Sequence, residues 1–537
     1  MSVDGLGPCS GLIVRESGCA LGWLNIVQSW AQARDVPQEC VHQISAFGWE
    51  GEAHVQSEDA SFTDLEARSV LESRVLADMI GSRLVPEVNE AQAALFGRRF
   101  NGVSHLLQAL AKDSDVGRIL FVAFVQRTSQ VLDVGNPPAD KPPRALRVRA
   151  VADYFYSLGA VEVHRQRRKH DGPSAVTLST LIEQATWTKQ MSGLHWTTLE
   201  GMLDNGPFRA TISCVDASQF TMEAADLRDA CDRGQTFEES VRDRQAVLGV
   251  SGGFFLYSEP DIVTPSRRYD PVDCLIQNGS LLNPPCFGRP CVIQRRSGQV
   301  DIQRLHPTGM RVSGAGFSCV VDEVNWHVWT RTNGLAVPSG GTHVVVIGTR
   351  VVSMSRGNST SIPLNGWVLV GPEAVWPKWT VGQTLQFVFE DTADPVWNAM
   401  AGGPWLYAAG DVSLPDSGFS GTAPPRTFSA DETGDCNLLP RMAVGVRPDN
   451  TVVFAAVDGR HFERALGMTL AQLGQLMGHL GCITSMNLDG GASKRMVVAG
   501  RVQDLSTSDV VGTHGSEHVR PVRTALFWSR RALQDRD

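Results

Sequence analysis

Two short runs in the last third of the chain combine a carboxylate with glycine. Asp458 precedes Gly459, and Asp489 precedes Gly490 and Gly491. Glycine has no side chain, so a ligand can approach the backbone closely at these points. A carboxylate in such a setting can perform acid/base or glycosyl-cation chemistry, or hold a divalent metal.

Two arginines lie near these runs in the sequence, Arg441 and Arg460. Their planar guanidinium groups suit the binding of a phosphate. Each residue alone also fits a plainer role, because an Asp-Gly pair after a strand is more often a turn and Arg441 can be a surface charge. A functional interpretation of the two runs therefore depends on the secondary-structure elements that contain them.

A strand–helix–strand pattern surrounds the two carboxylates. The apolar run 451–457 predicts a buried strand, and 483–488 predicts a second one. Between them, Thr469 and Gln472 form a capping box in front of a helix over 470–480, and Gly481 fits the left-handed stop after it. If the crossover is parallel, both strands end at the same edge of a sheet. We therefore expect Asp458 and Asp489 at one edge.

Several segments resemble the phosphodiester glycosidase domain family. The strongest are Leu439 to Val446, Val457 to Arg460, Gly467 to Leu470 and Met486 to Ser493. Three others agree in order: Ser251-Gly252-Gly253-Phe254-Phe255 is similar to the family's Asn-Gly-Gly-Phe-Phe, Gly402 to Leu406 resembles the segment before the main block, and Glu517 with Arg520-Pro521-Val522 resembles the closing segment. The resemblance spans about 192–530.

The resemblance implies a hydrolase that cleaves the glycosidic bond of a sugar 1-phosphodiester, such as an N-acetylglucosamine 1-phosphodiester, and releases the sugar and a phosphomonoester. It implies Asp489 as nucleophile or base, Asp458 as its partner or a ligand of a sugar hydroxyl, and Glu517 as a reserve acid/base. The expected substrate-binding residues are Arg441 and Arg460 as a phosphate clamp, with Ser251, Gly252, Gly253, Gly490, Gly491 and Ser493 shaping the pocket.

The chain departs from the family pattern at several positions. Ser251 stands where the family usually has asparagine, and Met442 replaces a threonine. Lys494 and Arg495 follow Ser493, where the family has small hydroxyl residues. These two cations either contact an extra anionic group on the substrate or form salt bridges across the surface.

Two alternatives to a working hydrolase stay open. The departures from the family pattern favour a catalytically reduced module that binds a glycan or a nucleotide-sugar. In the other alternative, the first third of the chain is the functional part and docks a partner protein.

The chain changes character near residue 190. Before it, apolar residues at helical spacing predict a mostly α-helical accessory domain over 1–191, with helices after the capping box at Thr63 and over 103–112, 119–131, 146–158 and 178–191. After it, short β-branched runs bounded by Gly, Pro, Asn or Asp predict strands over 210–215, 247–250, 343–347, 367–370 and 384–389. We expect an α+β fold, with mixed or antiparallel sheets flanked by helices in a catalytic domain over 192–537.

The overall charge argues against nucleic acid as a partner. The 537 residues carry a formal net charge of -9, and the basic run 165–170 is followed by a turn signal typical of a solvated loop. No stretch approaches the ~20 apolar residues of a membrane helix. The expected partner is a small-molecule or glycan phosphodiester substrate, without nucleic acid or membrane.

Cysteine spacing and the first residues bear on metal and compartment. None of the 11 cysteines lies in a cluster with zinc-ligand spacing. A calcium or magnesium ion would suit the carboxylate edge, but no loop of the EF-hand type is present and no metal is expected to be required. Asp4, Arg15 and Glu16 interrupt the apolar residues at the start, so no secretory signal is predicted and the default expectation is cytoplasmic.

Overall fold

The computed structural model describes residues 174–256, 269–322, 324–389, 393–408, 411–412, 438–461, 463–507 and 520–531, together with 161, 164 and 168. The accessory domain over 1–191 and the helices expected within 1–160 therefore lie almost wholly outside the described residues. So does Glu517.

The described residues are mostly β. They form 27 strands and four α-helices, and the neighbouring strands in the sheets all pair antiparallel. The expected α+β class with helix-flanked sheets is therefore wrong, although of the mixed or antiparallel pairing that was expected the described strands show the antiparallel one, and an amino-terminal helical domain is not shown. The physical reason is that the apolar runs stack sheet against sheet, so much of their surface is covered by other strands rather than by helices.

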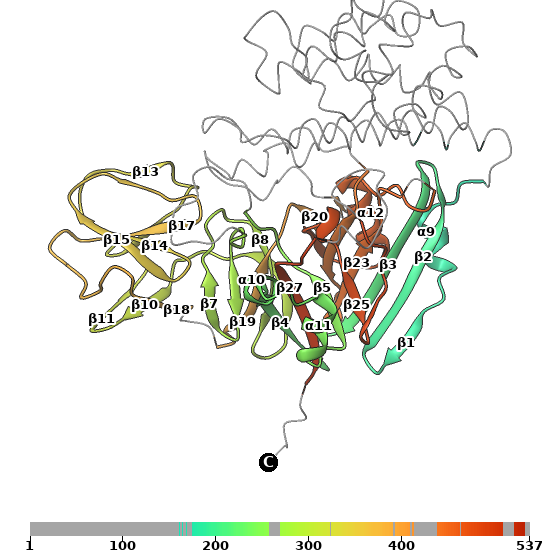
Figure 1. The fold of residues 1–537 in the computed structure, drawn as a ribbon, viewed down its shortest axis with the longest axis horizontal. Coiled ribbons are helices and arrows are strands. Elements are labelled where there is room, and N and C mark those ends of the chain that lie inside the picture. Colours follow the sequence, from blue (N-terminus) through green and yellow to red (C-terminus); the bar gives the residue numbers. More distant parts are fainter. Residues whose placement is uncertain are drawn as a thin grey trace, which may run out of the picture.

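An eight-stranded sheet carries both carboxylate runs (Figure 1). Its strands are, in spatial order, β1 (Thr188–Met191), β2 (Leu194–Leu203), β3 (Gly206–Asp216), β23 (Thr451–Val457), β22 (Arg441–Val446), β24 (Thr484–Leu488), β20 (Trp405–Ala408) and β21 (Asp411–Val412). β23 and β24 both pair antiparallel with β22, so they run in the same direction. The crossover is thus parallel, which is the condition for the expected shared edge, and β22 is inserted between its two strands.

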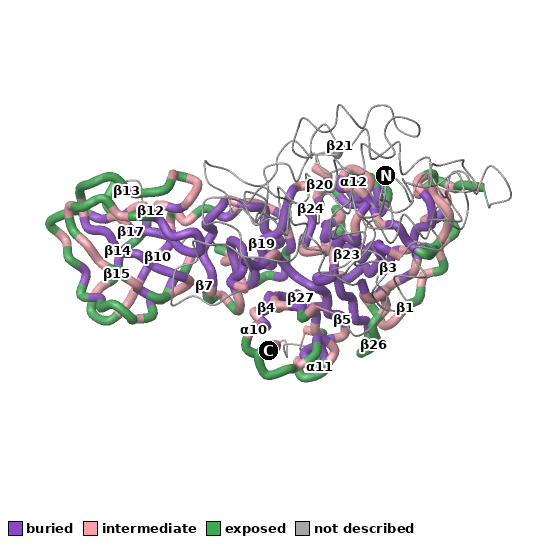
Figure 2. The backbone as a smooth tube through the Cα atoms, turned by 45° about the horizontal axis from the view of Figure 1, so that its top comes forward, coloured by how far each residue is buried: buried purple, intermediate pink, exposed green. Residues whose placement is uncertain are grey.

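Two five-stranded sheets cover one face of the eight-stranded sheet. One contains, in order, β26 (Arg501–Val502), β25 (Met496–Val498), β5 (Leu248–Ser251), β27 (Thr524–Arg530) and β4 (Phe220–Asp226). The other contains β7 (Ser280–Asn283), β6 (Leu275–Gln277), β19 (Val396–Ala401), β8 (Pro290–Arg295) and β9 (Val300–Arg304). Their shared core includes Phe454 from β23, Trp528 from β27 and Met400 from β19. Figure 2 shows this buried interior.

Alternation along β23 explains why its whole sequence is apolar. Phe454 faces the core between the sheets, whereas Val453 and Ala455 belong to the cluster beneath helix α12 (Leu470–His479). Successive side chains point to opposite faces of a strand, and both faces of β23 are covered. Strand β23 thus has no solvent-facing side for polar residues.

Helix α12 forms as the sequence predicts. The Thr469 hydroxyl accepts the backbone N–H of Gln472, and the Gln472 side chain accepts the Thr469 N–H, so the capping box is confirmed. Gly481 ends the helix with a φ of 82°, as expected. Gly445 of β22 lets the helix approach the sheet, because a Cβ there would lie 2.8 Å from the Met477 Cε of the helix.

The helix expected over 178–191 is only partly present. Helix α9 spans Leu178–Glu183, and Thr188–Met191 is strand β1, which pairs with β2. The spacing of apolar residues in 178–191 suits a helix. Its last residues instead pair with the backbone of β2, and the spacing of side chains does not predict such a pairing. Helices α10 (Arg228–Asp232) and α11 (Phe237–Asp243) pack on the sheet that contains β27.

A β lobe is inserted between β9 and β19. It holds a three-stranded sheet of β11 (Phe317–Val320), β10 (Met310–Gly314) and β18 (Gln386–Phe389), a four-stranded sheet of β12 (His327–Trp329), β17 (Gly366–Gly371), β14 (Thr342–Ile347) and β15 (Arg350–Arg356), and the pair β13 (Ala336–Val337) and β16 (Thr360–Ser361). Figure 1 shows it at one end of the molecule, away from β23. The strands predicted at 343–347, 367–370 and 384–389 are confirmed here as β14, β17 and β18.

Candidate active site

Arg441, Asp458 and Asp489 meet at one end of the eight-stranded sheet. Arg441, at the start of β22, pairs with Val457, the last residue of β23. The next residue of β22 pairs with Leu488, the last residue of β24. Asp458 and Asp489 directly follow these strand ends, one on each side of β22. The predicted shared edge is therefore confirmed.

Asp458 is enclosed by ion pairs. Its side chain is 0% exposed, Arg209 of β3 donates to Oδ2, and Lys494 donates to Oδ1 at 2.6 Å. The backbone N–H of Leu505 also donates to Oδ1, at 2.9 Å. Both carboxylate oxygens are thus bonded within the protein, on the side away from solvent.

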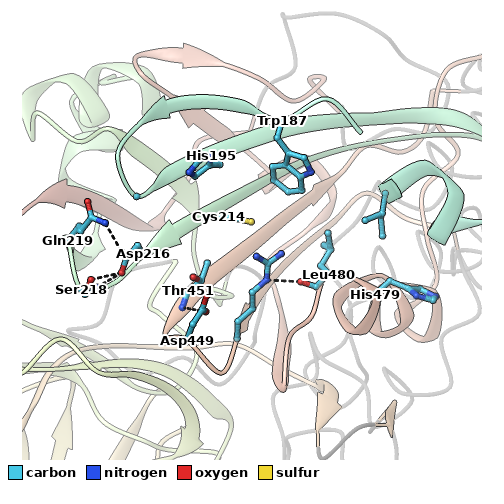
Figure 3. Close-up of a pocket in the computed structure, with 13 residues that line it drawn as sticks. Trp187, His195, Cys214, Asp216, Ser218, Gln219, Asp449, Thr451, His479 and Leu480 are labelled. Carbon is cyan, nitrogen blue, oxygen red and sulfur yellow. Dashed lines mark hydrogen bonds between the residues drawn. The ribbon is translucent and has the colours of Figure 1, made fainter. Parts of the chain in front are cut away.

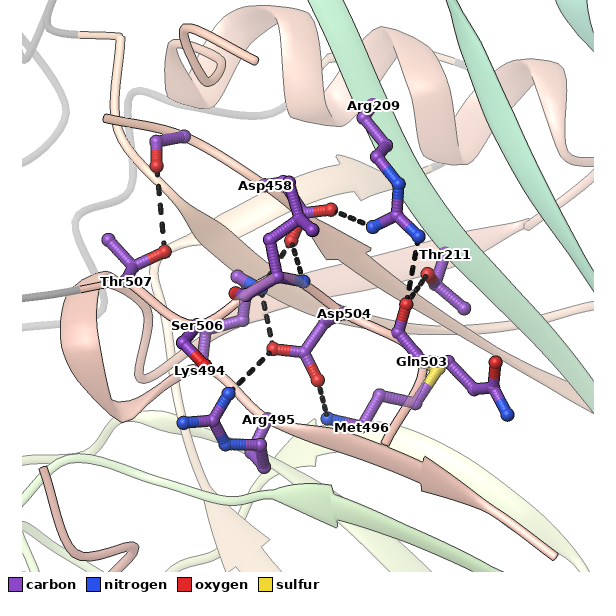
Figure 4. A network of polar contacts seen from close by, with 12 residues as sticks. Arg209, Thr211, Asp458, Lys494, Arg495, Met496, Gln503, Asp504, Ser506 and Thr507 are labelled. Carbon is purple, nitrogen blue, oxygen red and sulfur yellow. Dashed lines mark hydrogen bonds and ion pairs between the residues drawn. The ribbon is translucent and has the colours of Figure 1, made fainter. Parts of the chain in front are cut away.

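Lys494 and Arg495 belong to the same buried network, drawn in Figure 4. Lys494 bridges Asp458 and Asp504, with 2.7 Å from Nζ to the Asp504 Oδ2, and Arg495 lies 3.3 Å from the same oxygen. The Lys494 side chain is 0% exposed and that of Arg495 is 4% exposed. The sequence left open whether these cations contact the substrate or form surface salt bridges. In the structure they form salt bridges, and these are buried.

The Asp489 turn lies against the start of β22. The N–H of Asp489 donates to the Gly252 carbonyl at 3.0 Å, and the N–H of Gly491 donates to the Pro440 carbonyl at 2.9 Å. A Cβ on Gly490 would lie 2.5 Å from that same Pro440 oxygen, and Gly491 has a φ of 58°. A side chain does not fit at Gly490, the backbone conformation favours glycine at Gly491, and the Asp489 side chain stays half-buried at the edge.

The two arginines are held at this edge by different means. Arg441 is 7% exposed, and its Nε donates to the Met468 carbonyl at 3.1 Å. Arg460 is 8% exposed and has a φ of 61°. A Cβ on Gly491 would lie 3.7 Å from the Arg460 Nη1, so this guanidinium lies beside the Asp489 turn. The left-handed backbone of Arg460 costs roughly 1–3 kcal/mol and persists only when the surroundings fix it.

The run from Ser251 to Gly253 supports the turn from the neighbouring sheet. The Ser251 hydroxyl accepts the N–H of Arg495 at 3.1 Å, and the Ser251 N–H donates to the Arg495 carbonyl at 2.9 Å. A Cβ on Gly253 would lie 2.2 Å from the Ala401 oxygen, and one on Gly252 would meet the backbone of Thr524 at 2.9 Å. These glycines bring β5, β19 and β27 together behind the site.

Asn487 is a site residue to which the sequence assigned no role. It exchanges backbone hydrogen bonds with Gly403 and Pro404, at 2.7 and 3.0 Å, and its Nδ2 donates to the Gly403 carbonyl at 3.2 Å. The Asn487 Oδ1 and the Ser493 hydroxyl are buried and have no hydrogen-bond partner in the structure. A substrate hydroxyl or an ordered water can satisfy such atoms.

Arg289 and Asp273 form a support that the sequence did not indicate. The buried Arg289 side chain donates from Nε to the Gly402 carbonyl and lies 4.9 Å from the ring centre of Phe254. Asp273 Oδ2 accepts the N–H groups of Phe287 and Arg289, at 3.1 and 2.7 Å. Burial raises the pKa of Asp273 to about 6, against the lowering effect of the contacts with Arg289.

A separate cavity of about 740 Å³ lies at the opposite edge of the sheet (Figure 3). Trp187, His195 and Cys214 are among its lining residues. Thr451 also lines it and begins β23, whereas Asp458 follows the end of that strand, ~20 Å away at about 3.3 Å per residue. Burial raises the pKa of Cys214 to about 11, so its thiol is protonated at neutral pH.

The described residues offer no evident metal site. In that part of the chain, no group of three or more His, Cys, Asp or Glu side chains is arranged to hold a metal ion. Nor does any described helix have the length and apolar character needed to cross a membrane.

Comparisons with known proteins agree with the resemblance seen in the sequence. Residues 340–528 match the model of the phosphodiester glycosidase family. The SPbeta prophage-derived protein YomE of Bacillus subtilis strain 168 is 40% identical over 78 residues, which are 14% of this chain and 12% of that protein.

Three solved structures are similar at low identity. A hypothetical protein from Synechocystis has a TM-score of 0.41 and 18% identity, covering 67% of this chain and 64% of its own. A Burkholderia pseudomallei protein that its name describes as exported has a TM-score of 0.38 and 19% identity, covering 61% and 75%. The catalytic domain of zebrafish N-acetylglucosamine-1-phosphodiester alpha-N-acetylglucosaminidase, auto-inhibited by its pro-peptide, has a TM-score of 0.37 and 14% identity, covering 65% and 87%.

The comparisons bear on two expectations from the sequence. The cytoplasmic location is corrected and not retained, because one of the similar proteins is described by its name as exported. The family expected from the motifs is confirmed over the segment that contains Arg441, Asp458, Arg460 and Asp489. The chain therefore carries a phosphodiester glycosidase domain, matched over residues 340–528.

Proposed function

We propose that the domain hydrolyses the bond between the anomeric carbon of a sugar and the oxygen of a phosphodiester, with an N-acetylglucosamine 1-phosphodiester as the first substrate to test. The observation that carries the proposal is the grouping of one half-buried carboxylate, Asp489, with two buried arginines, Arg441 and Arg460, at a glycine-lined sheet edge. This grouping combines a carboxylate for the sugar with cations for the phosphate.

The chemistry requires little help for the leaving group. When the C–O bond breaks, its electron pair goes to the phosphate oxygen, and the guanidinium groups of Arg441 and Arg460 stabilise the added negative charge. Asp489 stabilises the positive charge that develops on the sugar ring, either as a nucleophile or as the base that takes a proton from the attacking water. The water oxygen ends on the anomeric carbon, and the products are the free sugar and a phosphomonoester.

Asp458 takes a supporting role in this proposal. Its oxygens are bonded to Arg209, Lys494 and Leu505, which leaves neither for a proton transfer to substrate. It also follows a strand that is two positions from the strand of Asp489 in the sheet, so the ends of the two strands are ~10 Å apart. Glu517, outside the described residues, remains the reserve acid/base.

The polar atoms beside Asp489 suit the sugar. We propose that the Ser493 hydroxyl and the Asn487 Oδ1, which have no partner in the structure, bind sugar hydroxyl or amide groups directly or through water. Ser251 holds the chain of Arg495 instead, so its contribution is to the shape of the pocket, as is that of the neighbouring glycines.

The test is turnover on a panel of sugar 1-phosphodiesters and nucleotide-sugars, followed by phosphate release with an added phosphatase. Activity is expected with at least one N-acetylhexosamine 1-phosphodiester, and Asp489→Asn is expected to lower kcat by about a thousandfold or more while the circular dichroism spectrum is unchanged. Near wild-type turnover by folded Asp489→Asn would reject the assigned role.

A binding module is the second candidate. The enclosure of Asp458 by ion pairs favours it, because one of the two carboxylates at the edge is not available for chemistry. In that case the same panel gives saturable binding by calorimetry, no product from any phosphodiester, and loss of binding in Arg441→Ala.

A further inference from the structure

Lys494 connects the two loops of the candidate site. It comes directly after the turn Gly491–Ser493, and its side chain reaches Asp458, the first residue of the other loop, at 2.6 Å. The Nζ atom also donates to the Leu505 carbonyl at 3.1 Å, and the side chain is fully buried (Figure 4). The contact therefore ties the two loops together below the surface, without a place for substrate on Lys494 itself.

Arg460 follows this tie closely along the chain, and its backbone conformation is an unusual one. It lies two residues after Asp458 and has a φ of 61°, which a residue with a side chain rarely adopts unless its neighbours impose it. Gly459 between them has no room to move toward Pro440, because a Cβ would lie 2.6 Å from the Pro440 nitrogen. Asp458, which Arg209 and Lys494 hold, therefore anchors the start of the short segment that leads to Arg460.

We propose that Lys494 is a positioning residue that holds the Arg460 guanidinium beside the Asp489 turn. Lys494 touches neither substrate nor the reacting atoms; it acts through Asp458 on the backbone of Arg460. The inference rests on the proposed function for the role of Arg460 in binding the phosphate.

Arg495 supplies a matched control. It is the neighbouring cation of the same buried network, but its ion pair is with Asp504 and not with Asp458. Arg495→Met removes one buried positive charge, as Lys494→Met does, yet leaves the link between the two loops in place. General loss of stability affects both variants, whereas loss of positioning affects Lys494→Met alone.

The kinetic test compares both variants on the phosphodiester that the wild type turns over. Lys494→Met is expected to raise KM by about tenfold or more with a smaller change in kcat, because a misplaced clamp weakens binding of the phosphate. Arg495→Met is expected to keep KM within about twofold of wild type, because it leaves the ion pair between Lys494 and Asp458 in place. Equal increases in KM would overturn the proposal.

A double-mutant cycle with Arg460→Ala tests the route of the effect. If Lys494 acts through Arg460, Lys494→Met changes kcat/KM by less than about twofold once Arg460 is alanine. Should Lys494→Met fail to fold, Asp458→Asn takes its place with the same expectation. A fully additive cycle, or a fall in kcat alone in Asp458→Asn, would overturn the proposal.

A crystallographic comparison separates this inference from the proposed function. If the wild type hydrolyses no phosphodiester, the proposed function fails, and the inference is then judged on structures of Lys494→Met and Arg495→Met. Arg460 is expected to leave the positive-φ region in Lys494→Met and to keep it in Arg495→Met. An unchanged Arg460 backbone and guanidinium in Lys494→Met would reject the positioning role whatever the substrate.

Discussion

Asp273 is expected to make the stability of the fold depend on pH in the mildly acidic range. The residue is 1% exposed, its φ is 70°, and its Oδ1 has no hydrogen-bond partner in the structure. Burial raises its pKa from the ordinary 3.8 to about 6. At about 1.4 kcal/mol per pH unit, ionising this carboxyl in the folded chain costs roughly 3 kcal/mol more than in the unfolded chain.

The sign follows from the direction of the shift. Because the folded pKa lies above the unfolded one, the protonated carboxyl contributes its full stability below pH ~4, and that contribution is lost as the pH rises through about 6. Asp273→Asn cannot ionise, yet it keeps a side-chain oxygen to accept the N–H groups of Phe287 and Arg289. The difference in free energy of unfolding, wild type minus variant, should therefore fall by roughly 2 to 3 kcal/mol between pH 4 and pH 7.5.

Urea unfolding of both proteins at intervals over this pH range measures the difference directly. Other titrating groups shift both curves alike, so the comparison isolates Asp273. A difference that stays constant with pH, or that grows in favour of the wild type toward neutral pH, would refute the reasoning.

Three further outcomes follow from the packing around the site. Gly490→Ala should abolish activity and lower the melting temperature, since its Cβ would lie 2.5 Å from the Pro440 oxygen; a soluble, active variant in the sugar phosphodiester assay would contradict this. Leu473→Ala, at a fully buried position of α12, should cost about 2–5 kcal/mol in urea unfolding, against less than 1 for an exposed control such as Gln475→Ala. Thr469→Ala should cost about 1 kcal/mol by the same measurement, because the Gln472 N–H loses its acceptor, and Thr469→Ser should retain most of that stability.

Local patterns in the sequence predict the parts of the site that depend on neighbours along the chain. The apolar run of β23, the capping box at Thr469 and the stop at Gly481 are each encoded within a few residues. These patterns were enough to predict that Asp458 and Asp489 lie at one edge of the sheet. They were not enough to predict that β22 lies between β23 and β24, because the pairing of β22 with these two strands depends on the tertiary structure.

The charged network could not be predicted for the same reason. Arg209 precedes Asp458 by 249 positions, and the two meet because β3 pairs with β23. Asp504 gives no signal of its own, since one carboxylate after a short polar strand fits a surface turn equally well. Only the assembled sheets make clear that Lys494 is enclosed and that Asp458 is bonded on both oxygens.

The order of strands in the sheets also determines how much of the chain a fragment must contain in order to fold. Each residue of β23 pairs with β3, from Thr451 with Asp216 to Val457 with Ala210, and β25 pairs with β5. A fragment trimmed to 340–528 would lose β3, β4 and β5 and leave β23, β25 and β27 with open hydrogen-bonding edges, which invite aggregation. The segment that identifies the family is thus shorter than the autonomous folding unit, and an expression fragment should begin before β1 at Thr188.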